Sequence, residues 1–552
     1  NIYKDDLPAS QSGALSSVID VRLRDGDMRQ WHSSGSIGLL TARAMAEGPI
    51  KKDKSSVLIA ARRTYVDQVL GPILRSQNFD LKFYFYDINL KFNYKFDNKN
   101  RIFLSYYTGT DKINHSMYVK KHNQSAALRF NHIFGEYLVS NLTITDTYDF
   151  ARLSNFHYSS AYKWYSINWN IKCKLDFTQR IGLNTTLKYG SQTAFYNIDP
   201  FNLQTDSTNL RSADSRINAQ PIIGQDFYTE LTHNIGAKLT ILLGARFNIQ
   251  RSPTDYTNSS DSTITYPDIN ASVSYRTMPD MLLKLSASLK HQPLHQLQVS
   301  SYSISVNRWM PANSRYMPED SRNISLSAHY MPASNVSTST SIYYRTQHNL
   351  IETLQQMRLI YEIDPEKYAR HSSAHIKGFE LNASTTIAGL KLDASYDYTD
   401  SEWKTLGLNN NKYYPASHIR KHSFNITGIY TINNRIKLSA AWQIASGIPY
   451  TSAIGKYMID NKMVLQFDQN IINSKRLPNY HRLDLSLDIE GQQNSIRRWQ
   501  SYWNFSIYNA YAHKNPIGVA YFTTNNKNQT VFKPGYYYFY QFVPSISYKF
   551  VF

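Results

Sequence analysis

From about residue 80 onward, side chains alternate between apolar and polar from one residue to the next. In Lys82–Phe96 the even positions from Tyr84 to Phe96 are aromatic or aliphatic, and the odd positions from Asp87 to Lys95 are charged or amide side chains. A period of two is typical of a β-strand, in which successive side chains point to opposite faces. The segment predicts a strand of about 15 residues, which is longer than the strands of ordinary sheets.

The same alternation recurs later in the chain, and the polar faces of these segments are rich in charge. Between Leu483 and Ile489, for example, apolar residues alternate with Arg482, Asp484 and Asp488. Burying an unpaired charge is costly, so a dry sandwich core cannot hold charges at this density. The pattern therefore predicts an all-β transmembrane antiparallel barrel with a wet lumen. The recurring segments are Leu390–Thr399, Ile436–Ile444 and Arg482–Glu490.

Connections between the expected strands alternate between short and long, which is typical of outer-membrane barrels. A tight hairpin is also expected near residues 31–47. Eleven outer connections in all predict about 22 strands, and a barrel of that size has a lumen that needs a plug. The short turns are expected at Asp97–Asn100, Gly135–Glu136, Gln179–Arg180, Asn234–Gly236, Met331–Asn335 and Thr431–Asn434. The long loops are expected at 62–79, 109–123, 149–158, 193–221, 252–265, 292–318, 346–373, 404–417, 447–478 and 511–534.

Composition agrees with strands that are apolar on one face only. The 552 residues include 43 Tyr, 25 Phe and 8 Trp, yet the mean hydropathy is −0.47. No run of about 18 apolar residues exists, which excludes a transmembrane helix. Disordered chains are poor in aromatic residues, so disorder is excluded as well. The single cysteine, Cys173, shares a face with Ile171 and Leu175 and is expected to face lipid.

The formal net charge of +19 has two interpretations. Lys and Arg are spread along the chain, which favours a hydrated lumen and loops that bind anionic lipid head groups. Attraction to an anionic ligand is the alternative. We expect outer-membrane lipids as partners and no nucleic acid.

The last strand ends in an aromatic alternation. Tyr548, Phe550 and Phe552 share one face, and Phe552 is the last residue. This ending resembles the signal that the outer-membrane barrel-assembly machinery reads. The alternative is an ordinary final strand that ends at Phe.

The first 30 residues differ from the rest and resemble a known motif. From Pro8 to Gly26 the sequence resembles the end of the plug domain of Bacteroidetes TonB-dependent receptors, with departures at Leu7, Ser10, Gln11, Ser12 and Ala14. The resemblance implies a plug end at residues 1–30 and a barrel at 31–552. The matching positions are Pro8, Ala9, Gly13, Leu15, Ser16, Ser17, Val18, Asp20, Val21, Arg22, Asp25 and Gly26.

Weaker family motifs continue in order through the barrel, among them Trp309–Pro311, Lys377–Glu380, Ser446–Tyr450 and Arg476–Asp484. The resemblance implies a receptor that imports a scarce nutrient across the outer membrane of a Gram-negative bacterium. The nutrient is an iron chelate, cobalamin, a glycan or a peptide. TonB, driven by ExbB–ExbD, would act through a TonB box and plug that precede residue 1. A surface lipoprotein is a further partner by analogy.

Candidate ligand residues are Arg62, Arg63, Tyr196, Tyr361 and Tyr457, which we expect in the ligand-binding loops. Their alternative roles are loop packing, a place in the aromatic belt, or contact with the plug. We expect His291 and His295 in a loop, because Pro293 prevents the helix that an HxxxH metal pair needs. No catalytic motif, cofactor site or metal site is recognised, so an enzyme is not expected. A passive porin-like channel remains the alternative function, followed by a barrel enzyme or an adhesin.

Overall fold

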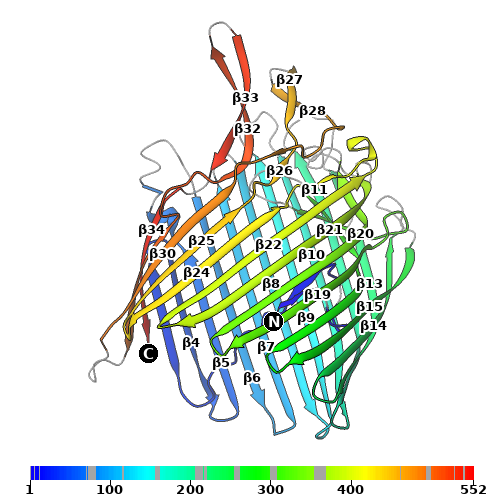
Figure 1. Ribbon diagram of the computed structural model, residues 1–552, viewed down its shortest axis with the longest axis vertical. Coiled ribbons are helices and arrows are strands. Elements are labelled where there is room, and N and C mark those ends of the chain that lie inside the picture. The colour runs from blue at the N-terminus through cyan, green and yellow to red at the C-terminus, as the bar shows by residue number, and fades with distance from the viewer. Residues whose placement is uncertain are drawn as a thin grey trace.

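In the computed structural model, antiparallel strands form a closed barrel around a short N-terminal segment (Figure 1). One end of the barrel carries long connections and is called the loop end. The other end carries short turns and is called the turn end. The structure describes residues 2–4, 7–11, 13–69, 71–72, 82–114, 117–155, 162–205, 215–216, 220–253, 261–298, 307–353, 369–459, 462–492, 499–526, 529–538 and 541–552.

The wall contains 22 long strands among the described residues, and β3 pairs with β34 to close the ring. The expected fold class is therefore confirmed. In ring order the strands are β3 (His32–Gly38), β4 (Thr41–Lys51), β5 (Ser55–Thr64), β6 (Lys82–Lys95), β7 (Asn100–Asn114), β8 (Met117–Ile133), β9 (Leu138–Asn155), β10 (Tyr162–Ile181), β11 (Thr185–Thr205), β13 (Gln220–Ile235), β14 (Leu239–Pro253), β15 (Asp261–Met278), β16 (Met281–Gln292), β19 (Glu319–Ala333), β20 (Val336–Thr353), β21 (Ala369–Ile387), β22 (Leu390–Thr405), β24 (His422–Asn433), β25 (Ile436–Ala445), β30 (Tyr480–Glu490), β31 (Gln500–Tyr508) and β34 (Val543–Val551).

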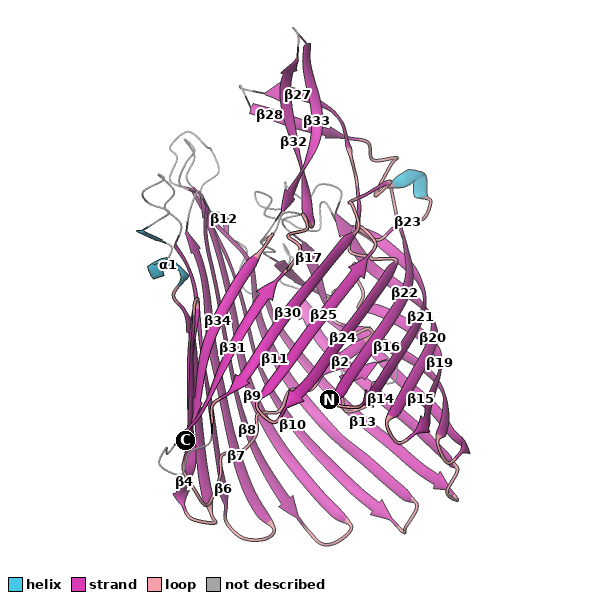
Figure 2. Cartoon of the chain, turned by 60° about the vertical axis from the view of Figure 1, so that its left-hand side comes forward, coloured by secondary structure: helices cyan, strands magenta, loops and turns pink. Residues whose placement is uncertain are grey.

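Shorter elements lie inside the barrel and at its loop end. The N-terminal segment contributes β1 and β2, which pair with each other inside the barrel. Most of the others lie at the loop end, where β32–β33 and β27–β28 project beyond the wall (Figures 1 and 2). No described helix is long and apolar enough to cross a membrane. These elements are β1 (Ile2–Lys4), β2 (Ser17–Ile19), α1 (Val66–Val69), β12 (Ser215–Arg216), β17 (Leu294–Gln298), β18 (Asn307–Pro311), the 3-10 helix Asn409–Asn411, β23 (Tyr414–Pro415), β26 (Pro449–Tyr450), β27 (Ala453–Ile459), β28 (Lys462–Phe467), β29 (Lys475–Arg476), β32 (Pro516–Asn526) and β33 (Gln529–Tyr538).

The alternation of the sequence corresponds to the two faces of the wall. On β6, Tyr86 and Ile88 are 39% and 40% exposed on the outer surface, whereas Asp87 and Asn93 are buried on the lumenal side. Cys173 is exposed on the outer face of β10, as expected. Outer side chains of a barrel meet lipid and lumenal ones meet water or protein, which explains why the polar face tolerates so many charges.

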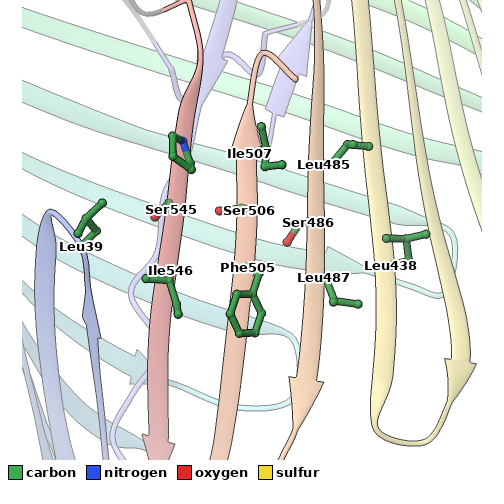
Figure 3. Close-up of a pocket in the computed structure, with 11 residues that line it drawn as sticks. Leu39, Leu438, Leu485, Ser486, Leu487, Phe505, Ser506, Ile507, Ser545 and Ile546 are labelled. Carbon is green, nitrogen blue, oxygen red and sulfur yellow. The ribbon is translucent and has the colours of Figure 1, made fainter. Parts of the chain in front are cut away.

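Neighbouring strands align their outer apolar side chains into rows. Leu438, Leu487, Phe505 and Ile546 are register partners across β25, β30, β31 and β34. Figure 3 shows these side chains at one level of the wall, with Ser486 and Ser506 between the apolar positions. Together with Leu39 they line an apolar recess of about 560 Å³. The rows form the surface that this side of the barrel presents to lipid.

Strand length varies around the ring. Strands β10 and β11 have 20 and 21 residues, whereas β3, β31 and β34 have 7, 9 and 9. About ten residues suffice for a tilted strand to cross a bilayer. The longest strands therefore extend well beyond the membrane, while the shortest barely span it.

Short turns and long loops alternate along the chain as expected, but some of them differ from the prediction in length or position. Eleven connections lie at the loop end, and the tight hairpin near residues 31–47 is the β3–β4 hairpin. The predicted long loop at 109–123 is wrong, because β7 continues to Asn114 and β8 begins at Met117. The polar residues of this segment face the lumen and outside water instead of forming a loop. The turns expected at Gln179–Arg180 and Asn234–Gly236 lie two to three residues later, after Ile181 and Ile235.

Turn-end connections follow ordinary turn chemistry. After β6, the Asp97 Oδ1 accepts hydrogen bonds from the backbone N–H groups of Lys99 and Asn100, at 2.7 and 2.8 Å. The Asn100 side chain also donates to this carboxylate, and these hydrogen bonds lower the pKa of Asp97. Gly182 and Gly236 have positive φ angles of 64° and 61° in their turns, a conformation that glycine adopts without steric cost.

Candidate functional site

The lumen holds the N-terminal segment against one side of the wall through a buried charged cluster. The Arg246 side chain on β14 is fully buried and donates from Nη1 to the Ala9 carbonyl at 3.2 Å. The backbone N–H of Ala9 donates to Glu230 Oε2 on β13 at 2.9 Å. One residue of the segment is thus held on both sides by charged groups of the wall. Charge-assisted hydrogen bonds are stronger than neutral ones, so this contact is well suited to fix the segment.

Every nitrogen group of Arg246 has a partner in this cluster. Nη2 lies 2.5 Å from Asp226 Oδ2, and Nε donates to Asn248 Oδ1 at 3.1 Å. Gln192 also donates to Asp226, at 3.1 Å. A buried guanidinium is tolerated only when it is paired and hydrogen-bonded, and this one is. We name Arg246, Asp226, Glu230 and Ala9 the docking cluster.

The other end of the segment contacts a different part of the ring. Ser56 on β5 donates to the Gly26 carbonyl at 2.6 Å. A Cβ on Gly26 would lie 2.5 Å from the Val57 carbonyl oxygen, so only glycine fits here. Arg24 pairs with the buried Glu47 of β4 at 2.6 Å. The segment is therefore held against two distant parts of the wall.

A folded hairpin, β17–β18, narrows the mouth at the loop end. Strand β17 contacts β20, and β18 contacts β11, so the hairpin lies along the inner side of the intervening strands. Gln250 and Ser252, on the lumenal face of β14, donate to the Ala312 carbonyl at 3.3 and 2.9 Å. Leu297 and Met310 of the hairpin form a small apolar core with Tyr316, Ile351 and Ala369. The mouth is thus a packed surface on this side.

Three histidines near this mouth pair with carboxylates. His295 is fully buried on β17 and lies 3.0 Å from Glu319, while His291 lies 2.9 Å from Asp268. His348 lies 3.1 Å from Asp320. His291 lies on the wall strand β16, so its expected loop position is wrong, whereas His295 lies on the hairpin β17–β18 within the connection expected at 292–318. Among the described residues, no three His, Cys, Asp or Glu side chains are grouped so that they could hold a metal ion.

The residues of the N-terminal motif lie along the segment inside the barrel. Gln11 N–H donates to the Pro8 carbonyl in a turn, and Gly13 has a φ of 76°. Ser17 begins β2, next to Ser16, and Asp20 pairs with Arg22 at 2.9 Å. The five motif residues Pro8, Gly13, Ser16, Ser17 and Asp20 do not belong to the docking cluster. Their neighbour Ala9 does.

Arg62 and Arg63 lie on β5 rather than in a loop, so the expected loop position is wrong for both. They are adjacent on a strand and therefore face opposite sides of the wall. Arg62 faces the lumen, where Nε and Nη2 each lie 2.7 Å from Asp87 Oδ2. Arg63 faces outward, 5.8 Å from the Tyr84 ring.

The three candidate tyrosines have different positions. Tyr196 lies on β11, not in a loop, and faces the lumen with Lys172 Nζ 5.4 Å from its ring. Tyr457 lies on the projecting hairpin β27–β28 and is 48% exposed. Tyr361 lies outside the described residues. The structure does not bring Tyr196 and Tyr457 together with Arg62.

The three C-terminal aromatic residues line the outer face of β34. Tyr548 packs 4.9 Å from Trp503, and Phe552 packs 5.9 Å from Trp499, measured between ring centroids. The Phe550 ring covers Gly35 of β3, where an added Cβ would lie 2.4 Å from the ring. These aromatic side chains cover the seam at which the ring closes.

The docking cluster was not predicted from the sequence. Arg246 follows the lumenal register of β14, between the outward residues Ala245 and Phe247, and that much could have been found from the alternation. Its contact with Ala9 spans 237 residues and depends on how the segment is placed in the lumen. No local spacing in the sequence encodes such a contact.

Comparison with known proteins agrees with this architecture. Residues 67–511 match the family described as TonB dependent receptor-like, beta-barrel. No curated protein matches this sequence at a significant level. The family and the similar structures are transport receptors rather than enzymes.

Several solved structures share the fold. A copper transporter, OprC, is 12% identical with a TM-score of 0.69, and the match covers 100% of this chain and 85% of that one. The ferric yersiniabactin uptake receptor FyuA from Yersinia pestis is 12% identical with a TM-score of 0.66, covering 96% and 80%. The ferripyoverdine receptor of Pseudomonas aeruginosa is 11% identical with a TM-score of 0.68, covering 100% and 75%. At these identities the likeness concerns the fold alone.

The family match covers most of the chain, and the closed barrel has the lipid-facing and lumenal faces that an outer-membrane protein requires. Its strands cross the outer membrane many times. The chain belongs to the TonB-dependent receptor family of outer-membrane β-barrels.

Proposed function

We propose that this protein is an outer-membrane receptor that imports one scarce nutrient with energy supplied by TonB and ExbB–ExbD. The substrate is an iron chelate, cobalamin, a glycan or a peptide. The observation that carries the proposal is the N-terminal segment docked inside a barrel of this size. A segment fixed to the wall by a few charged contacts can block passage and still be displaced by force.

Residues 1–30 act in this proposal as the end of a plug, and residues 31–552 as the barrel. Support comes from the motif between Pro8 and Gly26 and from the contacts of Ala9 and Gly26 with the wall. A TonB-driven pull would have to break the hydrogen bonds of the docking cluster. Their polar nature suits this role, since water can replace protein partners once the lumen is wet.

The proposal is tested by ligand retention followed by uptake. The full chain is purified from its native membrane in mild detergent, and retained small molecules are identified by mass spectrometry. Uptake of the identified compound by cells is then measured with and without a protonophore. We expect uptake to stop when the proton-motive force is removed. Uptake that continues unchanged would contradict energised import and favour the passive channel.

The alternative function, a passive porin-like channel, predicts a different conductance. An unplugged barrel with a lumen of this size would conduct ions continuously in a planar bilayer. We expect the full chain to show low conductance, because the docked segment occupies part of the lumen. Large, steady conductance steps from the intact protein would support the channel.

Ligand contact is proposed for the loop-end surface and the upper lumen. Tyr196 and Arg62 face the lumen, Tyr457 lies on a projecting hairpin, and Tyr361 belongs to the same candidate set. Arg63 faces outward and is therefore not proposed to contact a ligand in the lumen. Alanine substitution of Tyr457 or Tyr196 should weaken binding of the identified compound by at least several-fold. Unchanged affinity in both variants would remove these residues from the binding surface.

Two partner proposals remain. Tyr548, Phe550 and Phe552 form the signal for the barrel-assembly machinery, and deletion of Phe552 should lower the amount of folded barrel in the membrane. A surface lipoprotein covers the loop end, and it should co-purify in stoichiometric amount. Normal assembly without Phe552, or purification without any lipoprotein, would contradict the respective proposal.

A further inference from the structure

A transverse row of polar side chains crosses the wall where the barrel closes. Lys549 on β34 is the register partner of Ser36 on β3, and Ser36 is the partner of Arg43 on β4. Arg43 is the partner of Arg62 on β5, and Arg62 is the partner of Asp87 on β6. Register partners on adjacent strands point to the same face. All five side chains therefore face the lumen at neighbouring positions, about 4.8 Å apart from strand to strand.

This row carries more positive than negative charge. Asp87 is its one carboxylate, and Arg62 already pairs with that group at 2.7 Å. Arg43 Nε donates to the neutral Ser36 hydroxyl at 2.8 Å, and Lys549 Nζ lies 5.2 Å from the Tyr502 ring. Within the described part of the chain, neither Arg43 nor Lys549 has a carboxylate within ion-pair distance. Among the residues that the structure describes, two of the three cations thus have no anionic partner.

Arg43 and Arg62 lie directly opposite each other on adjacent strands. Like charges in this position repel each other and destabilise the pairing of the strands. An anion between them would remove the repulsion. Guanidinium groups present several N–H donors in one plane, which suits the oxygens of a carboxylate or phosphate.

The row borders a cavity of about 360 Å³. The charged side chains Arg43, Arg62, Asp87 and Lys549 line it together with small residues and Met45. This volume is in the range of small-ligand sites and accommodates a group with several oxygen atoms. The cavity is thus large enough for an anionic group and has cations at its edge.

The docked N-terminal segment passes next to this cavity. Arg24 Nη2 lies 3.3 Å from Met45 Sδ and 2.6 Å from Glu47 Oε1. Met45 is two residues from Arg43 along the lumenal face of β4. The cavity therefore lies in the lumen beside the segment that the proposed transport cycle would displace.

We propose that Arg43, Arg62 and Lys549 form a binding site for a small multivalent oxyanion, a carboxylate- or phosphate-bearing ligand. The role of the site in transport rests on the proposed function. In that role the site holds the anionic part of the substrate as the substrate passes the N-terminal segment. Arg43 and Lys549 supply the uncompensated charge, and Arg62 exchanges part of its contact with Asp87 for the ligand.

Calorimetric titration of the full chain in mild detergent at low salt tests the site, with citrate and inorganic pyrophosphate as probes. The two probes distinguish carboxylate from phosphate ligands. We expect at least one to bind, and the double variant Arg43→Gln/Lys549→Gln to bind at least ten-fold more weakly. The matched control is Lys437→Gln, which removes a lumenal lysine from β25, a strand that β30 and β31 separate from β34.

A variant that is expected to strengthen binding distinguishes a change at the site from a loss of folding. Asp87→Asn removes the competing carboxylate and should tighten binding several-fold. No binding of either probe to the unaltered protein, or equal affinity in the double variant and the control, would overturn the site. Both outcomes are read without TonB, so they are independent of whether energised uptake occurs. Weaker binding in Asp87→Asn would likewise contradict the proposed electrostatics.

Discussion

Arg246 of β14 donates a hydrogen bond of 3.2 Å to the carbonyl oxygen of Ala9, which precedes it by 237 residues. The Arg246 side chain is completely buried in the lumen, so this contact and its pairing with Asp226 replace water around the guanidinium. The N-terminal segment therefore forms part of the environment of a buried charge. Loss of the arginine should affect both the wall and the segment.

Replacing Arg246 with Met should release the segment and lower stability. Removing one partner of a buried ion pair costs about 3–5 kcal/mol, because the remaining charge is left unpaired. We expect faster hydrogen exchange in residues 7–11 and a lower unfolding temperature. Arg276→Gln is the control, since Arg276 is exposed near a turn and donates to the Pro279 carbonyl. Equal exchange in the two variants would show that Arg246 does not hold the segment.

Two substitutions of Glu230 distinguish the contribution of its hydrogen bond to Ala9 from the contribution of its charge. In Glu230→Gln the side-chain oxygen still accepts from Ala9 N–H, whereas in Glu230→Leu it cannot. We expect the Leu variant to expose residues 7–11 to protease and the Gln variant to lose only the pairing with Lys188, at 3.3 Å. Lys188 is half exposed and can be solvated once the carboxylate is lost, so the Gln variant should remain closer to the unaltered protein than the Leu variant. Similar cleavage of both variants would contradict the assignment.

Gly35 leaves room for the Phe550 ring at the closing seam. A Cβ at Gly35 would lie 2.4 Å from that ring, so Gly35→Ala should destabilise the barrel by about 1–3 kcal/mol through overpacking. Loss of heat-resistant migration in a detergent gel at lower temperature measures this effect. Gly135→Ala is the matched control, because nothing lies within 4 Å of its added Cβ. If Gly35→Ala and the control lost heat-resistant migration at the same temperature, tight packing of Phe550 against Gly35 would be contradicted.

His418, in the loop-end turn between β23 and β24, predicts a local dependence on pH. Burial lowers the pKa of His418 from its ordinary value of 6.5. The folded loop thus binds fewer protons than the unfolded loop below that value, and its stability decreases as the pH decreases through and below about 6.5. Hydrogen exchange of residues 413–421, corrected for intrinsic rates, should be faster at pH 5 than at pH 7.

The variant His418→Phe keeps an aromatic ring without a titratable group. Its exchange in residues 413–421 should be the same at both pH values. A pH effect that persists in this variant would assign the titration to another group.

Much of the fold could be predicted from the sequence, because the alternation in segments such as Lys82–Lys95 reports directly which face meets lipid. The number of strands followed from the order of turns and loops. The failure at 109–123 has a physical reason: a strand that projects beyond the membrane is polar on both faces, and its composition then equals that of a loop. His122, for example, lies on the outward face of β8, in register with Thr110 and Tyr86, and hydrogen-bonds Thr110 at 2.9 Å.

The site was less predictable. Arg62 was among the predicted ligand residues and Arg43 lies on the adjacent strand β4, but Lys549 comes from β34, which meets β3 only when the ring closes. Likewise, the contact of Arg246 with Ala9 depends on the position of a segment inside the lumen. The alternation gives the face of each side chain, whereas register and closure decide which side chains meet.

The central claim is that successive side chains of each wall strand face lipid and lumen in turn. Nitroxide labels at Leu485, Ser486 and Leu487 of β30 test it most directly, in the full chain reconstituted into lipid. The account predicts that labels at 485 and 487 collide with dissolved oxygen in the bilayer, and that the label at 486 collides instead with a water-soluble nickel chelate. Equal accessibility at all three positions, or the reverse pattern, would contradict the barrel and with it the transport function.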